Sequence, residues 1–294
     1  MKKKLSTALF LLAFLAGLSL LLYPTVSDWW NGLHQTYAVA SYIKQVSNHS
    51  AEENQKIWDE AEAYNEKLYE SGEGIHDLTP EEEKEYDSLL NIGGDGIMGY
   101  VTIPKIHVQL PVYHGTDEAV LEIAIGHVTG SSLPVGGPNT HCVISGHRGL
   151  PSARLFTDID QLQEGDTFTL NVLDQTLTYE VDQIRTVLPD ELDDLAIQEG
   201  QDYFTLVTCT PYGVNTHRLL VRGHRIPNAA DNAHVVADAV QVSPLVVAPL
   251  IAVVILLILL LWLFLNNRSR KKKARLGIGS PKARGGKRKD GGKA

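Results

Sequence analysis

The sequence predicts a mainly β domain, a closed barrel or a sandwich of roughly 130 residues, preceded by a helical segment and flanked by two membrane spans. Three observations lead to this prediction. From about residue 93, short β-rich runs alternate with turns rich in Gly, Pro, Asn and Asp. Residues 28–92 instead show helical spacing of apolar side chains. Two long apolar runs without charged residues, 5–23 and 245–265, enclose both regions.

The β-rich region contains several runs in which β-branched, aromatic and other apolar residues predominate. The expected strands are Gly99–Ile103, Val108–Val112, Cys142–Ser145, Thr167–Val172, Leu177–Val187, Tyr203–Cys209 and Arg218–His224. A short helix is expected near Asp117, and a second over Ala153–Leu162. Strands this closely spaced favour a barrel or a sandwich.

The helical segment contains two recognisable helix starts. Ser50 and Glu53 form a capping box, in which the serine oxygen accepts a backbone hydrogen bond and the glutamate returns one. Apolar residues then recur at three- and four-residue spacing over residues 57–68. Thr79 and Glu82 repeat the box around a proline in the first turn. We therefore expect two helices joined by a loop.

Charge is unevenly distributed along the chain. The 294 residues carry a net charge of −9, although the first residues include three lysines and the tail from Arg268 is strongly basic. The region between the ends is therefore acidic and would repel the negative backbone of nucleic acid. Two cysteines are too few for a disulfide-built scaffold or a four-cysteine zinc module. The sequence therefore argues against nucleic-acid binding by the acidic region, and against a disulfide scaffold or a zinc module of this kind.

The two apolar runs predict a membrane protein. Residues 245–265 can cross a hydrocarbon core of about 30 Å, and the positive charge that follows marks the cytoplasmic side. A buried core helix is the less favoured alternative. Residues 5–23 are either a cleaved signal peptide or a retained anchor, with retention slightly favoured. The region between the two runs is then extracellular, held at the cell membrane. The expected segments are 1–27 basic start with signal peptide or anchor, 28–92 helical prefix, 93–228 β domain, 229–244 linker, 245–265 transmembrane helix and 266–294 basic cytoplasmic tail.

Candidate catalytic groups gather at the last two expected strands. If these form an antiparallel hairpin with Cys209 opposite Arg218, one face is apolar and both groups lie on the other, about 5 Å apart at the backbone. A nearby positive charge favours the nucleophilic thiolate, and an arginine can hydrogen-bond a carbonyl or a developing oxyanion. His147, which lies between two glycines after another strand, is the candidate acid/base group. The three residues together suit acyl transfer through a thioester.

Each of these residues also has a plainer interpretation. Cys209 as a buried small hydrophobe, Cys209 in a disulfide with Cys142, and Arg218 as a surface charge all remain open. A further group of histidines lacks the spacing of a metal site, which favours turn or surface roles. These are His107, His114, His127 and His141.

At these positions the chain resembles the sortase family. Residues 205–209, Thr-Leu-Val-Thr-Cys, match the sortase signature Thr-Leu-x-Thr-Cys, with Arg218 nine residues later and Ser-Gly-His-Arg-Gly upstream at 145–149. The resemblance covers about residues 93–227. The run from Cys209 to Arg218, the Ala-Glu-Ala-Tyr-Asn sequence at 61–65 and the C-terminal anchor resemble class C, the pilin-polymerising sortases.

This resemblance implies a closed sortase-type β-barrel with short helices. It implies that Cys209 attacks the Thr–Gly bond of a Leu-Pro-x-Thr-Gly-like sorting signal, that His147 is the general acid/base and that Arg218 stabilises the carbonyl or oxyanion. It also implies that Thr208 lines the substrate site. The implied partners are pilin subunits that bear the signal, with a pilin lysine as acceptor amine. No cofactor and no metal are expected.

The resemblance departs from class C at one place. Many class C enzymes carry a lid before the barrel, anchored by an Asp-Pro-aromatic tripeptide. The matching region, residues 72–91, lacks the tripeptide and has Asp77 and Leu78. We expect Asp77 to reach a basic site residue and Leu78 to fill the pocket, with Gly72 and Gly74 permitting hinge motion.

Two alternative functions accompany this prediction. In the first, the enzyme anchors surface proteins to the cell wall, because its acceptor is a peptidoglycan amine instead of a pilin lysine. In the second, which belongs to another class of function, the barrel is a catalytically inert binding domain tethered to the membrane.

Overall fold

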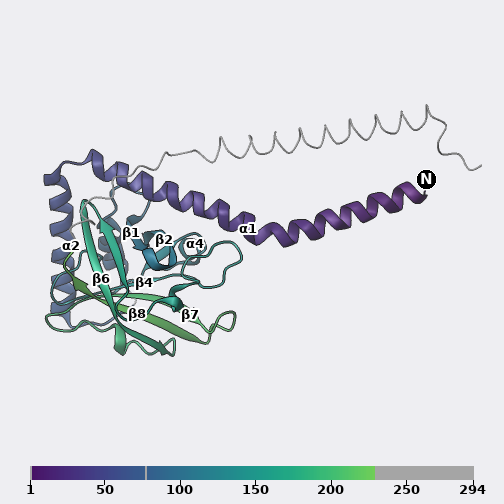
Figure 1. Cartoon of the computed structure of the whole chain (residues 1–294). Helices are drawn as coiled ribbons and strands as arrows, with labels where there is room; N and C mark the ends of the chain where they lie inside the picture. Colours follow the sequence, from purple (N-terminus) through teal and green to yellow (C-terminus); the bar gives the residue numbers. More distant parts are fainter. Residues whose placement is uncertain (1, 77, 229–294) are drawn as a thin grey trace, which may run out of the picture. The chain divides into compact units, whose positions relative to one another are not determined.

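The computed structural model describes residues 2–76 and 78–228, with only the backbone described for residues 2–15. Eight strands close into a barrel in the order β1-β2-β3-β4-β7-β8-β6-β5 (Figure 1). The strands are β1 Ile97–Ile103, β2 Val108–His114, β3 Ile125–His127, β4 Thr140–Ser145, β5 Thr167–Val172, β6 Gln175–Val187, β7 Asp202–Thr210 and β8 His217–Ile226. The prediction of a closed barrel is confirmed, and every expected strand is present. The expected linker, second span and tail lie outside the described residues.

Two local predictions differ from the structure. The three-residue strand β3, which pairs parallel with β2 and antiparallel with β4, was missed because its run is too short to show a period. The helix expected over Ala153–Leu162 is wrong, since only the 3₁₀ turn η2, Ile159–Gln161, forms there. Leu155 has a positive φ of 39°, which breaks a helix. The apolar residues of this loop are nevertheless buried in the core. The short helix α4, Glu118–Leu121, follows Asp117 as expected.

Three longer helices precede the barrel: α1 Lys2–Asn48, α2 Ala51–Ser71 and α3 Pro80–Ser88. Both predicted capping boxes are present, at the starts of α2 and α3. The helix α1 continues without a break across the segment boundary drawn at residue 27. Among the described side chains, no helix combines the length and the apolar character needed to cross a bilayer.

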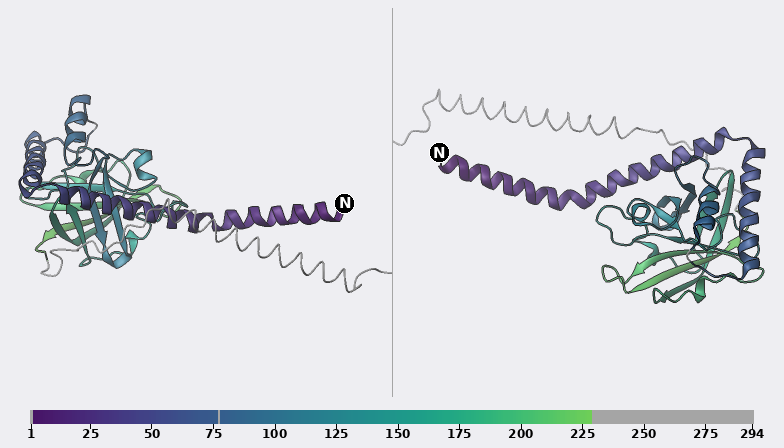
Figure 2. Two further views of the ribbon diagram at one scale, coloured as in Figure 1. Left: turned by 90° about the horizontal axis from the view of Figure 1, so that it is seen from above. Right: turned by 180° about the vertical axis from the view of Figure 1, so that it is seen from behind.

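Hydrogen bonds near the middle and the end of α1 attach this helix to the barrel. Asn31 donates to the carbonyl of Ser152 over 2.8 Å. The hydroxyl of Tyr42 donates to Met98 and accepts from the amide of Leu173 over 2.9 and 2.8 Å. Both views in Figure 2 show this part of α1 running along the barrel. Tyr42 therefore attaches α1 to β1 and, at the same time, to the turn that follows β5.

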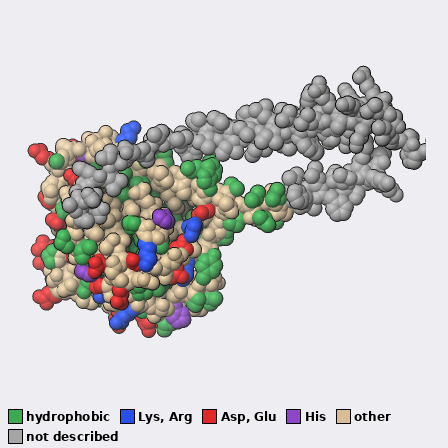
Figure 3. Space-filling view, viewed as in Figure 1, with side chains coloured by type: hydrophobic (Ala, Val, Ile, Leu, Met, Phe, Trp, Pro, Cys, Tyr) green, Lys and Arg blue, Asp and Glu red, His purple; other side chains and the backbone are tan. Residues whose placement is uncertain are grey.

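The helix α2 is attached to the barrel through a buried amide. Asn65 donates to the carbonyl of Leu133 over 3.0 Å and accepts from its amide over 2.7 Å. Both polar groups are thus satisfied away from water, where an unpaired amide would cost about 1–3 kcal/mol. The outer side of α2 is acidic, and Figure 3 shows red side chains along that edge of the domain.

A buried tyrosine–histidine pair holds α3 on the barrel. Burial lowers the pKa of His127 to about 4, so its ring is neutral at pH 7. Its Nε2–H donates to the carbonyl of Ser132 over 2.9 Å, which leaves Nδ1 to accept from the hydroxyl of Tyr86 over 2.9 Å. The same hydroxyl accepts from the amide of Gly115 over 3.0 Å. Every side-chain polar atom of the pair has a hydrogen-bond partner, so the position of α3 on the barrel is well defined.

Most of the histidines considered as surface groups therefore have structural roles. Besides His127, His141 is buried and bonds the carbonyl of Ala196 and the hydroxyl of Thr205. Both ring nitrogens of His114 lie near backbone carbonyls, at 2.8 and 3.0 Å. The expectation of turn or surface roles is wrong for His127 and His141.

We expect the fold to lose stability as the pH falls from about 6.5 towards 4. An unfolded histidine has a pKa near 6.5, whereas burial lowers the pKa of His127 and His141 to about 4 in the folded chain. Between pH 6.5 and 4 the unfolded state binds more protons than the folded state. The contribution of these two histidines to stability is therefore complete above pH 6.5 and is lost as the pH falls. The loss is at most about 1.4 kcal/mol per pH unit for each group.

Urea unfolding of the detergent-solubilised full chain at pH 7 and pH 5 measures this effect. His127→Gln should reduce the difference between the two free energies of unfolding, and His34→Gln, at an exposed position, should leave it unchanged. An equal pH dependence in all three proteins would contradict the assignment.

Candidate active site

The hairpin of β7 and β8 has the register that the sequence predicts. Cys209 lies opposite Arg218, and the pairs before it follow in step. Phe204, Leu206 and Val221 on one face are buried in the barrel core, as expected. The opposite face is also largely covered, by a smaller cluster made of Val143, Leu195, Val207 and Leu220. Cys209 and Arg218 at its end are partly exposed, as is Arg222 further along the same face.

Parallel pairing of β4 with β7 places His147 beside Cys209. The last pair of this ladder is Ser145 with Val207. The amide of the next residue, Gly146, still donates to the carbonyl of Val207 over 3.0 Å. His147 and Cys209 each lie two residues past the last pair, on chains that run about 4.8 Å apart in such ladders. The strand of Cys209 thus lies between the chain of His147 and the strand of Arg218.

The loop that carries His147 needs glycine at position 146. A Cβ there would lie 2.7 Å from side-chain atoms of both Ile125 and Phe156, which is closer than any real contact. The hydroxyl of Thr208 donates to the carbonyl of Gly146 over 2.7 Å, and the amide of Phe156 donates to the carbonyl of His147 over 3.1 Å. The backbone on both sides of the imidazole is therefore held in place.

The side chain of Thr208, which the resemblance implies lines the substrate site, has a structural contact. It lies on the core face of β7, almost fully buried, where its hydroxyl bonds the loop of His147. Its direct structural effect is to hold that loop against the strand of Cys209. A contact of Thr208 with substrate stays a prediction.

Both cysteines are free, and only Cys209 is partly exposed. Cys142 pairs with Phe204, five residues before Cys209, which separates the two cysteines by roughly 16 Å along the strand. A disulfide needs Cα atoms within about 7 Å, so the disulfide alternative is wrong. Burial raises the pKa of the Cys142 thiol well above its ordinary value, so this thiol stays protonated and unreactive.

Arg218 bonds one backbone carbonyl at the start of β8 and one in the loop before it. Its Nη1 donates to the carbonyl of His217 over 3.2 Å and, more weakly, to that of Asn215 over 3.5 Å. These bonds orient the guanidinium at the same strand end as the Cys209 thiol. A planar guanidinium held there can donate to an oxygen of a bound peptide.

The expected lid region contacts the barrel at separate places. Ile75 packs against the small cluster that contains Val207, two residues before Cys209 on the same face. The backbone of His76 lies so close to Gly130 that a Cβ there would be 2.8 Å from its nitrogen. Leu78 is partly buried against the main core. Asp77 lies outside the described residues.

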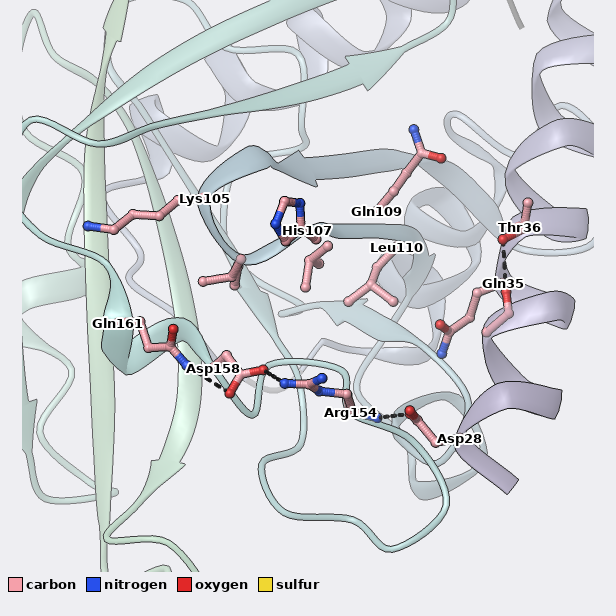
Figure 4. Close-up of a pocket in the computed structure, with 13 residues that line it drawn as sticks. Asp28, Gln35, Thr36, Lys105, His107, Gln109, Leu110, Arg154, Asp158 and Gln161 are labelled. Carbon is pink, nitrogen blue, oxygen red and sulfur yellow. Dashed lines mark hydrogen bonds and ion pairs between the residues drawn. The ribbon is translucent and has the colours of Figure 1, made fainter. Parts of the chain in front are cut away.

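A separate cavity of about 460 Å³ lies between α1, the start of β2 and the loop before η2 (Figure 4). Asp28, His107 and Arg154 are among the residues that line it. The lining includes none of His147, Cys209 and Arg218. The cavity is therefore distinct from the strand end that carries the candidate catalytic residues.

Comparison with known proteins agrees with the family that the sequence motifs resemble. Residues 101–226 match the sortase domain model. Sortase C1 from Streptococcus agalactiae is 55% identical, with a TM-score of 0.64, over 65% of this chain and 99% of that one. Sortase C from Clostridium perfringens, solved with the C-terminal cell wall sorting motif, is 41% identical, with a TM-score of 0.58, over 65% of this chain and 98% of that one.

A curated relative is more distant. Sortase D from Bacillus subtilis (strain 168) is 31% identical over 131 residues, which is 44% of this chain. The match spans 63% of that relative's length. The Streptococcus structure, by contrast, is covered almost completely at high identity. On these grounds the chain belongs to the sortase family of cysteine transpeptidases, within its class C.

Proposed function

We propose that this chain cleaves a Leu-Pro-x-Thr-Gly-like sorting signal and joins the new C-terminus to a lysine amine of a pilin subunit, which builds covalent pili. One observation carries the proposal: His147, Cys209 and Arg218 come to one end of three adjacent chains, with Cys209 in the middle. The sorting motif present in the Clostridium perfringens structure supports a peptide of this class as the substrate.

The first half-reaction forms a thioester. The sulfur of Cys209 attacks the threonine carbonyl carbon as the thiolate, its proton having passed to His147, and the oxygen takes up negative charge that the guanidinium of Arg218 stabilises. The C–N bond to glycine then breaks, and His147 donates a proton to the leaving amine. The C-terminal fragment departs, and the signal remains linked to Cys209 as a thioester.

The second half-reaction transfers the acyl group. A lysine amine attacks the thioester carbonyl, and His147, now neutral, takes the proton that the amine loses. The C–S bond breaks and sulfur leaves, which restores the starting enzyme. Arg218 stabilises the oxyanion in both halves because the same carbonyl reacts twice.

The proposal places this reaction on the outer side of the cell membrane. The runs 5–23 and 245–265 would hold the domain there, and the basic tail would stay in the cytoplasm. Exposed apolar side chains on α1 support contact with lipid, since such side chains are costly to leave in water. They include Leu20, Leu21, Tyr23, Val26 and Trp29.

The proposal also includes a lid formed by residues 72–91. Ile75 packs against the cluster that contains Val207, and Leu78 packs against the main core. Gly72, in the left-handed region with φ of 66°, would supply a flexible joint. Tyr86 holds α3 on the barrel, so the part free to open is the segment before α3. Asp77 remains the proposed partner of a basic site residue.

Covalent trapping tests the catalytic roles. Mixing the full chain with a sorting-signal peptide should give a thioester adduct on Cys209, visible by mass spectrometry. Cys209→Ala should abolish the adduct, and His147→Ala should reduce its rate at least about 10²-fold. Arg218→Lys should cost about 10²-fold, because lysine lacks the planar fork that holds the oxyanion. Full activity of Arg218→Lys would remove the proposed directional role.

The acceptor is tested with purified pilin. Pilin with its sorting signal should form covalent ladders on a denaturing gel, and replacement of the acceptor lysine should abolish them. Transfer to a peptidoglycan amine without ladders would identify an anchoring enzyme. Function that persists in Cys209→Ala would identify an inert binding domain.

Weakening the lid should expose the thiol. Leu78→Ala removes part of an apolar contact that is worth about 1–2 kcal/mol, so the open state becomes several-fold more populated. The rate of Cys209 alkylation by iodoacetamide should rise by the same several-fold factor. Ile123→Ala, at an exposed apolar position, is the matched control. An unchanged alkylation rate in Leu78→Ala would contradict the lid.

A further inference from the structure

A buried cation lies directly beside the candidate catalytic residues. The side chain of Arg148, the residue after His147, is only 10% exposed, although arginine is mostly a surface residue. Its Nη2 is ion-paired with Asp160 in η2. Its Nη1 donates to the hydroxyl of Thr210 over 3.3 Å. Burying a charged guanidinium is energetically unfavourable. The contacts that Arg148 makes therefore indicate its structural role.

Those contacts join the neighbours of both reacting residues. Arg148 follows His147 in the loop after β4, and Thr210 follows Cys209 at the end of β7. The bond between them therefore crosses the same gap that separates the imidazole from the thiol. The guanidinium also lies over the ring of Tyr212, with 5.9 Å from Cζ to the ring centre.

The loop of His147 is thus held at two points, before and after the imidazole. Before it, Gly146 bonds Val207 and Thr208 as an extension of the ladder between β4 and β7. After it, the paired strands have ended, and Arg148 supplies a link back to β7. The bonds from Phe156 to His147 and from Gly149 to Thr157 join the loop to its own later residues, whereas the bond of Arg148 joins it to the strand of Cys209.

We propose that Arg148 is a positioning residue, which, anchored by Asp160, clamps the His147 loop to Thr210 and so sets the distance between imidazole and thiol. This proposal rests on the proposed roles of Cys209 and His147. Arg148 acts through its neighbours and not on the substrate, because its side chain is largely buried and its terminal nitrogens bond Asp160 and Thr210. Arg218 supplies the charge that faces the substrate.

The test is the steady-state cleavage of a sorting-signal peptide by the full chain in detergent. Arg148→Lys keeps the charge but loses the fork that reaches both partners. Since a misplacement of about 1 Å can cost about 10²-fold in rate, we expect kcat to fall 10- to 100-fold while KM stays within twofold. Arg154→Lys is the matched control, because it alters an exposed ion pair with Asp158 in the same loop, on the side of the cavity in Figure 4.

A second variant isolates the link to β7. Thr210→Val removes only the hydroxyl that Arg148 bonds, so it keeps the test valid even if Arg148→Lys fails to fold. It should lower kcat with KM unchanged, and the double variant should be no slower than the slower single one, because both changes cut the same link. Thermal unfolding confirms that each variant is folded.

The outcomes separate this proposal from the one on which it rests. If the unaltered chain forms no Cys209 adduct, the proposed function fails. If the adduct forms normally and Arg148→Lys or Thr210→Val retains full kcat, the positioning role is overturned. Losses that multiply in the double variant, or a change confined to KM, would overturn it as well.

Discussion

Parallel pairing of β4 with β7 is the constraint on which the candidate site depends. The two strands are remote in sequence, and a parallel ladder brings their carboxyl ends to the same level. His147 and Cys209 both follow directly from the last paired residues. The antiparallel hairpin then adds Arg218 on the other side of Cys209. Without the parallel pair, the thiol and the guanidinium would still be neighbours, but no acid/base group would join them.

Around this pairing, small contacts determine where the imidazole can lie. Gly146 fits only because it has no side chain between Ile125 and Phe156. Thr208 lies on the core face of β7 and bonds the loop of His147, while Cys209, the next residue, lies on the opposite face. Adjacent residues of a strand point to opposite sides, so a single strand both supports the loop and carries the candidate nucleophile.

The helices before the barrel are attached to it by a few buried polar side chains. Asn65 and Tyr42 each satisfy two backbone groups of the barrel with one side chain, which attaches α2 and α1 at little desolvation cost. The neutral pair of Tyr86 and His127 attaches α3 in the same way. The short segment between α2 and α3 is thus anchored at both of its ends.

By itself, the sequence determined the mainly β class, the capped helices and the hairpin register, because caps, turns and two-residue periodicity are local patterns. The resemblance of short motifs then favoured the closed barrel and indicated Cys209, His147 and Arg218 as one candidate site. Tertiary structure alone decided that Thr208 bonds the loop of His147, that His127 and His141 are buried, and that residues 153–162 form an irregular loop. It also brought Arg148, Asp160 and Thr210 together. Such contacts join residues far apart in the chain, and no local spacing encodes which of them will meet when the barrel closes.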